Sequence, residues 1–290
     1  MNRVFSSCHC DDVQSWGLPR TVVVPAPPRK RGWVGFPCTR LAEERRFRPV
    51  RCGGGGNEGE GKVVVILGAT GSGKSRLSID LAARFHGEVV NSDKIQLYSG
   101  LDITTNKLPL DRRRGVPHHL LGEIDSLSLP DCAAADYRRL ASSAIAGVIS
   151  RSRLPVVAGG SNSFVYALLS RRFRPGPDVF DGGVPVSPEL RYRCCFLWVE
   201  VSPPVLDAYL RARVDDMLRS GMAEELAAFF AAEGVEAGTR PGLRRAIGVP
   251  EFARFFRLYP EGMSGRGGAG PEGDGDRSGR REAYEEAVRA

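Results

Sequence analysis

The chain has 290 residues, 42% hydrophobic and 26% charged, which is typical of a globular protein with one large domain or two small ones. Its net charge of +7 favours anionic ligands, although the first fifty residues, with nine Lys or Arg against four Asp or Glu, supply part of the excess. No apolar run reaches the ~18–20 residues that a membrane span needs, so we expect no membrane insertion.

Residues 1–59 show no sustained helix or strand periodicity and end in a glycine linker, RCGGGGNEGEG. Their Arg-rich composition predicts a disordered leader that serves as an organelle transit peptide, and a plain disordered extension is the alternative. The seven cysteines of the chain are odd in number and follow no disulfide framework, which indicates reduced thiols inside a cell. Cys194 and Cys195 lie in an apolar run and are expected in the core.

Strands and helices alternate from residue 60 onward. KVVVIL is typical of a buried strand, and a glycine loop and a helix-spaced segment, KSRLSIDLAARF, follow it. GEVVNSD predicts a second strand, RLPVVAGGSNSFVYALLS repeats the strand–turn–helix pattern, and RCCFLWVEVSPP predicts another buried strand. This alternation predicts an α/β fold, a P-loop NTPase-like parallel sheet with helices on both faces.

The rest of the domain, residues 203–260, is predicted to be helical, with Ser202 and Pro203 at the start of its first helix. Residues 261–280 are dominated by glycine and charge and predict a disordered tail. The last ten residues, REAYEEAVRA, look like the beginning of a helix whose pattern is still running at Ala290, so we expect a further C-terminal portion.

The segment GATGSGKS matches the phosphate-binding pattern G-x-x-x-x-G-K-[ST] at every position. Its backbone N–H groups and the N-terminus of the following helix converge on phosphate oxygens, Lys74 reaches the outer phosphate, and Ser75 is a ligand for Mg²⁺. The predicted phosphate-binding residues of this loop are Gly68, Ala69, Thr70, Gly71, Ser72, Gly73, Lys74 and Ser75.

Asp93, in NSDKIQ, follows a buried strand at the edge of the sheet where α/β proteins bind ligands. It could be a second carboxylate for Mg²⁺ or a general base for a nucleophile held near the loop. The structural alternative is a cap for a helix starting at Lys94. Ser92 and Asp93 are also predicted to contact a nucleotide.

Three further features carry polar groups that suit phosphates. On a helical wheel, Arg213 falls inside an apolar stripe, which predicts either a buried ion pair or a phosphate clamp. Ser161, in GGSNSF, is placed either to donate to a phosphate or to cap a helix. Arg244 and Arg245, in GLRRAIG, could hold further phosphates or form a solvated face, whereas His118 and His119 lack a third ligand and are interpreted as structural or substrate-lining.

In this order the segments resemble the isopentenyltransferases that prenylate adenine, with plant adenylate isopentenyltransferases, the cytokinin synthases, as the nearest match. The resemblance covers most of residues 62–257 and rests on GATGSGKS, NSDKIQLYSGLDITTNK, RRGVPHHLLG, GGSNSF, CCFLWVEV, LRARVDDMLRSGMAEEL and GLRRAIGVPEF. It implies transfer of the dimethylallyl group of dimethylallyl diphosphate to N6 of ATP or ADP, and less favourably of AMP, with Mg²⁺ as cofactor.

The resemblance implies a role for each residue of the site. Asp93 accepts the N6 proton, while Lys74 and Arg213 stabilise the departing diphosphate, with Mg²⁺ held through Ser75. Thr70 is added as a residue near the catalytic Asp, and Arg244 and Arg245 are expected near the phosphates of the nucleotide. We expect a monomer in the plastid, with the cytoplasm or a mitochondrion as alternative locations.

Three alternatives stay open at this point. A tRNA dimethylallyltransferase shares the loop and Asp93, but usually has GGT in place of GGS and often a zinc-finger tail, which the Cys and His spacing here does not match. A small-molecule kinase would use Asp93 for an acceptor hydroxyl or Mg²⁺. The third alternative is an inactive nucleotide-binding protein.

Overall fold

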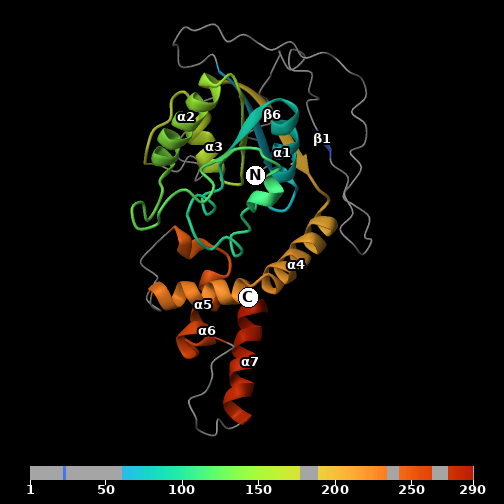
Figure 1. Cartoon of the computed structure of the whole chain (residues 1–290), viewed down its shortest axis with the longest axis vertical. Helices are drawn as coiled ribbons and strands as arrows, with labels where there is room; N and C mark the ends of the chain where they lie inside the picture. Colours follow the sequence, from blue (N-terminus) through green and yellow to red (C-terminus); the bar gives the residue numbers. More distant parts are fainter. Residues whose placement is uncertain (1–21, 24–60, 177–188, 234–241, 263–273, 290) are drawn as a thin grey trace.

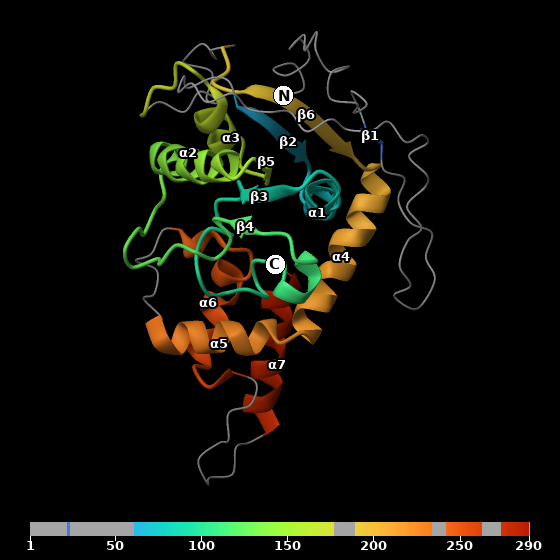
Figure 2. The same cartoon turned by 45° about the horizontal axis from the view of Figure 1, so that its top comes forward.

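The computed structural model describes residues 22–23, 61–176, 189–233, 242–262 and 274–289. Figure 1 shows an α/β part above a helical part, and the long helix α4 runs from one to the other. In Figure 2, which views the chain from a second direction, α4 descends from the end of β6 toward α5.

The sheet is parallel throughout its named strands, as predicted, and its order is β1-β6-β2-β5-β3-β4. Strand β2 therefore lies between β6 and β5, and its C-terminal end opens into the phosphate loop at the middle of the sheet. The strands are β1 (Val22–Val23), β2 (Lys62–Gly68), β3 (Gly87–Asn91), β4 (His118–His119), β5 (Leu154–Ala158) and β6 (Arg193–Glu200).

Helices cover both faces of this sheet because alternate residues of each strand point to opposite sides. On one face, Val64 and Ile66 of β2 pack with α1 (Lys74–Arg84). On the other face, Val63 and Val65 pack with α2 (Ala134–Ser150) and α3 (Asn162–Leu169). The predicted two-sided α/β architecture is confirmed, and α2 is an element that the sequence analysis did not anticipate.

The C-terminal part is helical, as predicted, and its first helix begins directly after Ser202. Its last helix packs on α6, where the Tyr284 ring lies 5.6 Å from that of Phe252 and 5.5 Å from that of Phe255. The helices of this part are α4 (Pro203–Arg219), α5 (Met222–Glu233), α6 (Val249–Leu258) and α7 (Asp274–Arg289), with a short 3₁₀ turn, η5 (Leu243–Arg245), before α6. A second 3₁₀ turn, η2 (Leu110–Arg113), lies in the α/β part between β3 and β4.

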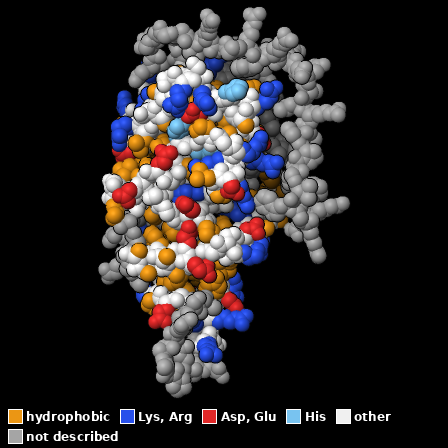
Figure 3. Space-filling model, viewed as in Figure 1, with side chains coloured by type: hydrophobic (Ala, Val, Ile, Leu, Met, Phe, Trp, Pro, Cys, Tyr) orange, Lys and Arg blue, Asp and Glu red, His pale blue; other side chains and the backbone are white. Residues whose placement is uncertain are grey.

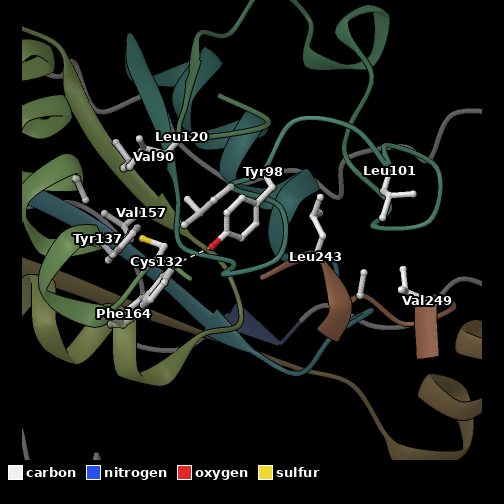
Figure 4. Packing of buried hydrophobic residues seen from close by; sticks show 14 of the residues in the cluster. Val90, Tyr98, Leu101, Leu120, Cys132, Tyr137, Val157, Phe164, Leu243 and Val249 are labelled. Atoms are coloured by element: carbon white, nitrogen blue, oxygen red, sulfur yellow. Dashed lines mark hydrogen bonds between the residues drawn. The ribbon is translucent and has the colours of Figure 1, made fainter. Parts of the chain in front are cut away.

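One hydrophobic cluster joins the two parts. It contains Val65 of the sheet, Tyr137 of α2, Leu243 of η5 and Phe252 of α6. Figure 4 shows Tyr98 within this cluster, between Cys132 and Leu243, with its hydroxyl accepting a hydrogen bond of 2.8 Å from the Cys132 backbone N–H. The helical part is thus an extension of the same core.

Two predictions at the chain ends need correction. Residues 274–280, expected in a disordered tail, form the first turns of α7, because the helix extends N-terminally beyond the apolar pattern of the last ten residues. Val22–Val23, expected in a leader without strands, pair with Val199 and Glu200 of β6. The remaining predictions for the leader and for residues 263–273 fall outside the described residues.

The prediction that the apolar stripe of α4 is buried in the core is also wrong. Val205 and Tyr209 are 38% and 52% exposed, and of the α4 residues only Met217 is buried. The helix leaves the C-terminal end of β6 and runs away from the sheet, so within the described residues most of its length is not covered by a second layer. Cys195 is buried as expected, whereas Cys194 is half-buried. None of the described helices combines the length and apolar character that crossing a bilayer requires.

Candidate active site

The phosphate loop occupies the turn between β2 and α1, and its lysine folds back over it. The Lys74 ammonium donates hydrogen bonds to the backbone carbonyls of Gly68, at 2.8 Å, and Ala69, at 2.7 Å. Gly73, at the start of α1, has φ of 96°, a left-handed conformation that L-residues with a side chain rarely adopt. The loop therefore opens its backbone N–H groups at the helix N-terminus, where an anion is favoured.

The charges around Lys74 show which predicted residues come together. Burial of the ammonium lowers the pKa of Lys74, the Asp93 carboxylate raises it, and the Arg213 guanidinium lowers it further. Asp93 follows β3, and Arg213 lies near the middle of α4. Three elements distant in sequence thus bring two cations and one carboxylate into a single electrostatic neighbourhood at the C-terminal edge of the sheet.

Asp93 is held by its own turn and by Asn91, the last residue of β3. The Asn91 side chain accepts from the Asp93 N–H at 3.1 Å and donates to the Asp93 carbonyl at 3.1 Å and to the Leu120 carbonyl at 2.9 Å. One carboxylate oxygen, Oδ1, accepts from the N–H groups of Ile95, at 3.1 Å, and Gln96, at 3.4 Å. That oxygen binds backbone N–H groups as a cap would, but the predicted helix from Lys94 is wrong, because residues 94–97 form a turn.

The glycine turn after β5 supports the Asp93 turn. A methyl group on Gly159 would overlap the carbonyl carbon of Ser92 and lie 2.5 Å from the Asp93 nitrogen, so glycine permits this approach. The Ser161 hydroxyl accepts from the Lys94 N–H at 2.9 Å, and the Ser161 N–H donates to the Ser92 carbonyl at 3.2 Å. Ser161 therefore joins the two turns, and it makes no side-chain cap for α3.

Helix α4 lies across the phosphate loop. A side chain at Gly71 would meet Leu210 at 2.9 Å and both Leu206 and Tyr209 at 3.2 Å, so these residues cover the loop. One turn further along, the Arg213 Nε is buried and has no hydrogen-bond partner among the described residues. A buried cationic donor without a partner is costly, and a phosphate oxygen would satisfy it. This observation favours the phosphate-clamp interpretation over an internal ion pair.

The other predicted site residues show fewer contacts with Lys74, Asp93 and Arg213. Thr70 and Ser75 are exposed at the loop surface, and Ser92 is fully buried between the two turns. Arg244 and Arg245 are exposed on η5, whose preceding Gly242 packs against the Tyr98 ring. No contact in the described part of the chain ties these two arginines to the phosphate loop.

The histidine pair, interpreted as structural or substrate-lining, makes contacts of the structural kind. His119 Nε2 lies 2.6 Å from the buried Glu88 carboxylate, which also binds Arg151, and His118 Nδ1 lies 2.9 Å from the Val116 carbonyl. Within the described ranges, no group of three or more His, Cys, Asp or Glu side chains is arranged to hold a metal. Oxygen donors that suit Mg²⁺ are nevertheless available at the loop, in the Ser75 hydroxyl and in Asp93.

Asn91 supports the Asp93 turn, and the sequence analysis missed it. It ends a fully buried strand with a polar side chain, and that pattern was a usable signal. Its bond to Leu120 could not be read from the sequence, because the two residues are 29 positions apart. Gly159 was recognised as part of a turn, but its contact with Asp93 was not.

Comparisons with known proteins identify a family and relatives of similar sequence. A family model described as IPP transferase matches residues 96–181 and 179–287. An adenylate isopentenyltransferase of Humulus lupulus is 55% identical over 232 residues, which cover 78% of this chain and 69% of the relative. Adenylate isopentenyltransferase 1, chloroplastic, of Arabidopsis thaliana is 56% identical over 202 residues, which cover 69% of this chain and 56% of the relative.

Solved structures show the same fold. A eukaryotic dimethylallyltransferase acting on tRNA matches with a TM-score of 0.59 at 25% identity, covering 79% of this chain and 68% of that one. A tRNA isopentenylpyrophosphate transferase of Bacillus halodurans matches with a TM-score of 0.55 at 24% identity, covering 80% of this chain and 85% of that one. The family model spans well over half of the sequence, and the chain belongs to the IPP transferase family.

Proposed function

We propose that this protein transfers the dimethylallyl group of dimethylallyl diphosphate to N6 of an adenine nucleotide. The observation that carries the proposal is a phosphate loop bound by Lys74 and covered by α4, whose buried Arg213 Nε lacks a partner among the described residues. The charges of Asp93 and Arg213 both act on Lys74. Two cations suit a diphosphate that leaves, and one carboxylate suits an acceptor that must lose a proton. The adenylate isopentenyltransferases that resemble the chain at 46–56% identity support this assignment.

The proposed reaction breaks the bond between C1 of the allyl group and the diphosphate oxygen, and it forms a bond between C1 and N6. Diphosphate leaves with the electron pair of the broken bond, and the N6 proton passes to the Asp93 carboxylate. A base is needed because the N6 lone pair is delocalised into the purine ring. Asp93 Oδ1 is engaged by backbone N–H groups, so Oδ2, which faces Gly160, is the oxygen assigned to this proton.

The negative charge that develops on diphosphate is met by cations and N–H dipoles that are already in position. Lys74 now binds two loop carbonyls and would turn to the phosphate oxygens when the donor enters. The Arg213 Nε would gain the partner that it lacks. Mg²⁺, held through the Ser75 hydroxyl, would neutralise further diphosphate charge.

A free nucleotide is the proposed acceptor, with ATP or ADP preferred to AMP. The relatives whose names specify adenylate support a free nucleotide over tRNA, and so does Ser161 in place of the Thr typical of tRNA-modifying enzymes, whereas the preference for ATP or ADP follows only from the resemblance to the plant enzymes. On the face shown in Figure 3, carboxylates are interspersed among the Lys and Arg side chains, whereas a tRNA backbone would favour a continuous basic band. Arg244 and Arg245 are the proposed partners for the nucleotide phosphates.

We also propose a plastid location and a monomeric state. Relatives from Arabidopsis thaliana are named chloroplastic, and another is named mitochondrial, which leaves the mitochondrion as the second candidate. The Arg-rich leader is consistent with import into either organelle.

The deciding experiment incubates the chain with Mg²⁺, dimethylallyl diphosphate and one of ATP, ADP, AMP or unmodified tRNA, and detects the added C5 unit by mass spectrometry. Prenylated ATP or ADP is the expected product. Prenylated tRNA alone would assign the chain to the tRNA-modifying branch, and phosphate transfer from ATP would indicate a kinase. A folded sample that binds nucleotide without any product would identify an inactive binding protein.

Asp93→Asn is the matched variant for this assay, since an amide oxygen still accepts from Ile95 and Gln96 while the base is lost. We expect kcat to fall by about 10²–10⁴, with the free energy of unfolding changed by less than ~1 kcal/mol. Full activity in this variant would remove Asp93 from the mechanism.

A further inference from the structure

Glu225, on α5, makes a set of contacts that the proposed reaction does not use. Its carboxylate accepts hydrogen bonds from the backbone N–H groups of Ile103, at 3.0 Å, and Thr104, at 2.7 Å, and from the Thr104 hydroxyl, at 2.6 Å. Three charge-assisted bonds to one carboxylate are a strong attachment, and Thr104 is only 3% exposed. The acceptor and the loop that it binds are 121 or more residues apart in the chain.

The loop that Glu225 holds, residues 101–107, is stiff. Its backbone closes on itself through bonds from Thr105 to Leu101, from Asn106 to Ile103 and from Lys107 to Asp102, all of 2.9 Å. The nearly buried Lys107 ammonium adds a bond to the Gly100 carbonyl and an ion pair of 2.9 Å with Asp102. Hydrogen bonds and one ion pair thus connect the loop from one end to the other.

The same loop is joined to the catalytic turn. The Gln96 side chain donates to the carbonyls of Thr105, at 2.9 Å, and Asn106, at 3.2 Å. The Gln96 N–H donates to Asp93 Oδ1 at 3.4 Å. A continuous path of hydrogen bonds thus runs from Asp93 through Gln96 and the 101–107 loop to Glu225. In Figures 1 and 2 this loop extends from the sheet toward α5.

Helix α5 is in turn closely connected to the helix that carries Arg213. Only Ser220 and Gly221 separate α4 from α5, and Gly221 turns the chain with φ of 100°. Since α4 has one buried residue of its own, Met217, its orientation over the phosphate loop depends on how α5 is anchored. The Glu225 contact is the polar part of that anchor.

We propose that Glu225 is a positioning residue that sets Arg213, on α4, relative to Asp93 and the phosphate loop. The inference rests on the proposed function, because it takes diphosphate as the group that Arg213 binds. Loss of the Glu225 carboxylate would let α4 and α5 shift together, and Arg213 would then contribute less to holding the diphosphate, although Glu225 itself touches neither.

The test is a double-mutant cycle on binding of inorganic pyrophosphate with Mg²⁺, measured by calorimetry. Arg213→Ala in the wild-type background should weaken binding by about 10–100-fold, the range for a charged hydrogen bond. Glu225→Gln should weaken it by about 10-fold. In the Glu225→Gln background, Arg213→Ala should cost about tenfold less than in the wild type, because the arginine is already misplaced. An equal cost of Arg213→Ala in both backgrounds would overturn the proposal.

Glu224→Gln is the matched control, because Glu224 is the exposed neighbour on the same helix and carries the same charge. It should leave pyrophosphate affinity within twofold, and a loss equal to that of Glu225→Gln would overturn the proposal by attributing the effect to charge alone. If Glu225→Gln does not fold, Thr104→Val and Thr104→Ser replace it in the cycle. The valine should weaken binding, and the serine, which keeps the hydroxyl, should restore it; equal affinities would overturn the proposal.

The outcome separates this inference from the proposed function. Pyrophosphate binding requires no prenyl transfer, so coupling without any C5 product would contradict the proposed function and support the positioning role. A C5 product without coupling between Glu225 and Arg213 would support the proposed function and contradict the positioning role. A wild-type chain that does not bind pyrophosphate would overturn both.

Discussion

Gly159 lies where the turn after β5 meets the turn that carries Asp93, and it is the residue at which backbone packing bears most directly on the catalytic group. A Cβ atom there would overlap Ser92 and come within 2.5 Å of the Asp93 nitrogen. Neither neighbour is the flexible end of a side chain, so the strain would have to be relieved by moving the Asp93 turn itself.

We expect Gly159→Ala to lower the free energy of unfolding by about 1–3 kcal/mol, the usual cost of overpacking, and to reduce the prenylation rate. Urea unfolding followed by circular dichroism measures the first effect. Gly160→Ala is the control, because its Cβ would lie 3.8 Å from Asp93 Oδ2, an ordinary contact. If the two alanines destabilise equally, the close approach at Gly159 is not the cause.

For single residues, the sequence predicted the groups proposed to react better than the residues that hold those groups in place. The roles proposed for Lys74 and Asp93 could be read from local patterns, because a loop motif and a strand end place them. The supporting bonds of Asn91 and Glu225 could not be read in this way, because their partners, Leu120 and Thr104, are brought close only by the folded chain. Arg213 was singled out by its helical phase, although the stripe that suggested it is not a core face.

Among the elements, β3 carries a buried carboxylate that joins three segments. Glu88 is 3% exposed and binds Arg151, after α2, and His119, of β4. The hydrogen bond from Arg151 is the main cause of its lowered pKa, with the bond from His119 acting in the same direction and burial opposing both. This group ties strands and helix together at the edge of the sheet away from the phosphate loop.

The lowered pKa has a consequence for acid stability. A carboxyl group whose folded pKa lies below its unfolded value stabilises the fold above the unfolded value, and the stabilisation is lost as the pH falls through the folded value. For Glu88 the loss therefore occurs below pH 4.5, the ordinary value. We expect Glu88→Gln to destabilise the protein at pH 7, and the difference from wild type to shrink as the pH falls below 4.5.

Thermal unfolding of both proteins between pH 3 and 7 measures this difference. Asp80→Asn is the control, because the Asp80–Arg114 pair is exposed on both sides and should contribute little at any pH. A Glu88→Gln penalty that stays constant down to pH 3 would show that the carboxylate charge is not what stabilises the cluster.

Strongly patterned elements were predictable and weakly patterned ones were not. The strands β2, β3, β5 and β6 follow from runs of β-branched and other apolar residues. The predicted burial of β6 is wrong, however, because only alternate residues of this strand are buried and Trp198 is 50% exposed. Helix α2, in contrast, has the segment AADYRRLASSAIAGVIS, in which alanines and serines blur the apolar face formed by Tyr137, Ala141, Ile145 and Val148. The sheet order also lay beyond local pattern, because it depends on which strands pair across the fold.

On the scale of the whole molecule, the helical part and the sheet behave as one body because they share a hydrophobic cluster. Phe252, Phe255 and Phe256 of α6 are each no more than 2% exposed, and they belong to the same cluster as Val65 of the central strand. Helix α7 adds Tyr284 to the far side of these rings. Packing at the end of the chain should therefore affect the stability of the entire fold.

We expect Tyr284→Ala to lower the free energy of unfolding by about 2–4 kcal/mol, since it removes a half-buried ring from an aromatic cluster. Unfolding should remain a single transition, and pyrophosphate affinity below the transition should stay within twofold of wild type, because α7 packs on α6, which carries none of Lys74, Asp93 and Arg213. Tyr284→Phe keeps the ring and should cost less than ~1 kcal/mol. Urea titration by circular dichroism, with calorimetry for binding, measures both quantities. A separate early transition in Tyr284→Ala would mean that α6 and α7 unfold on their own, and the helical part would then be a second cooperative unit.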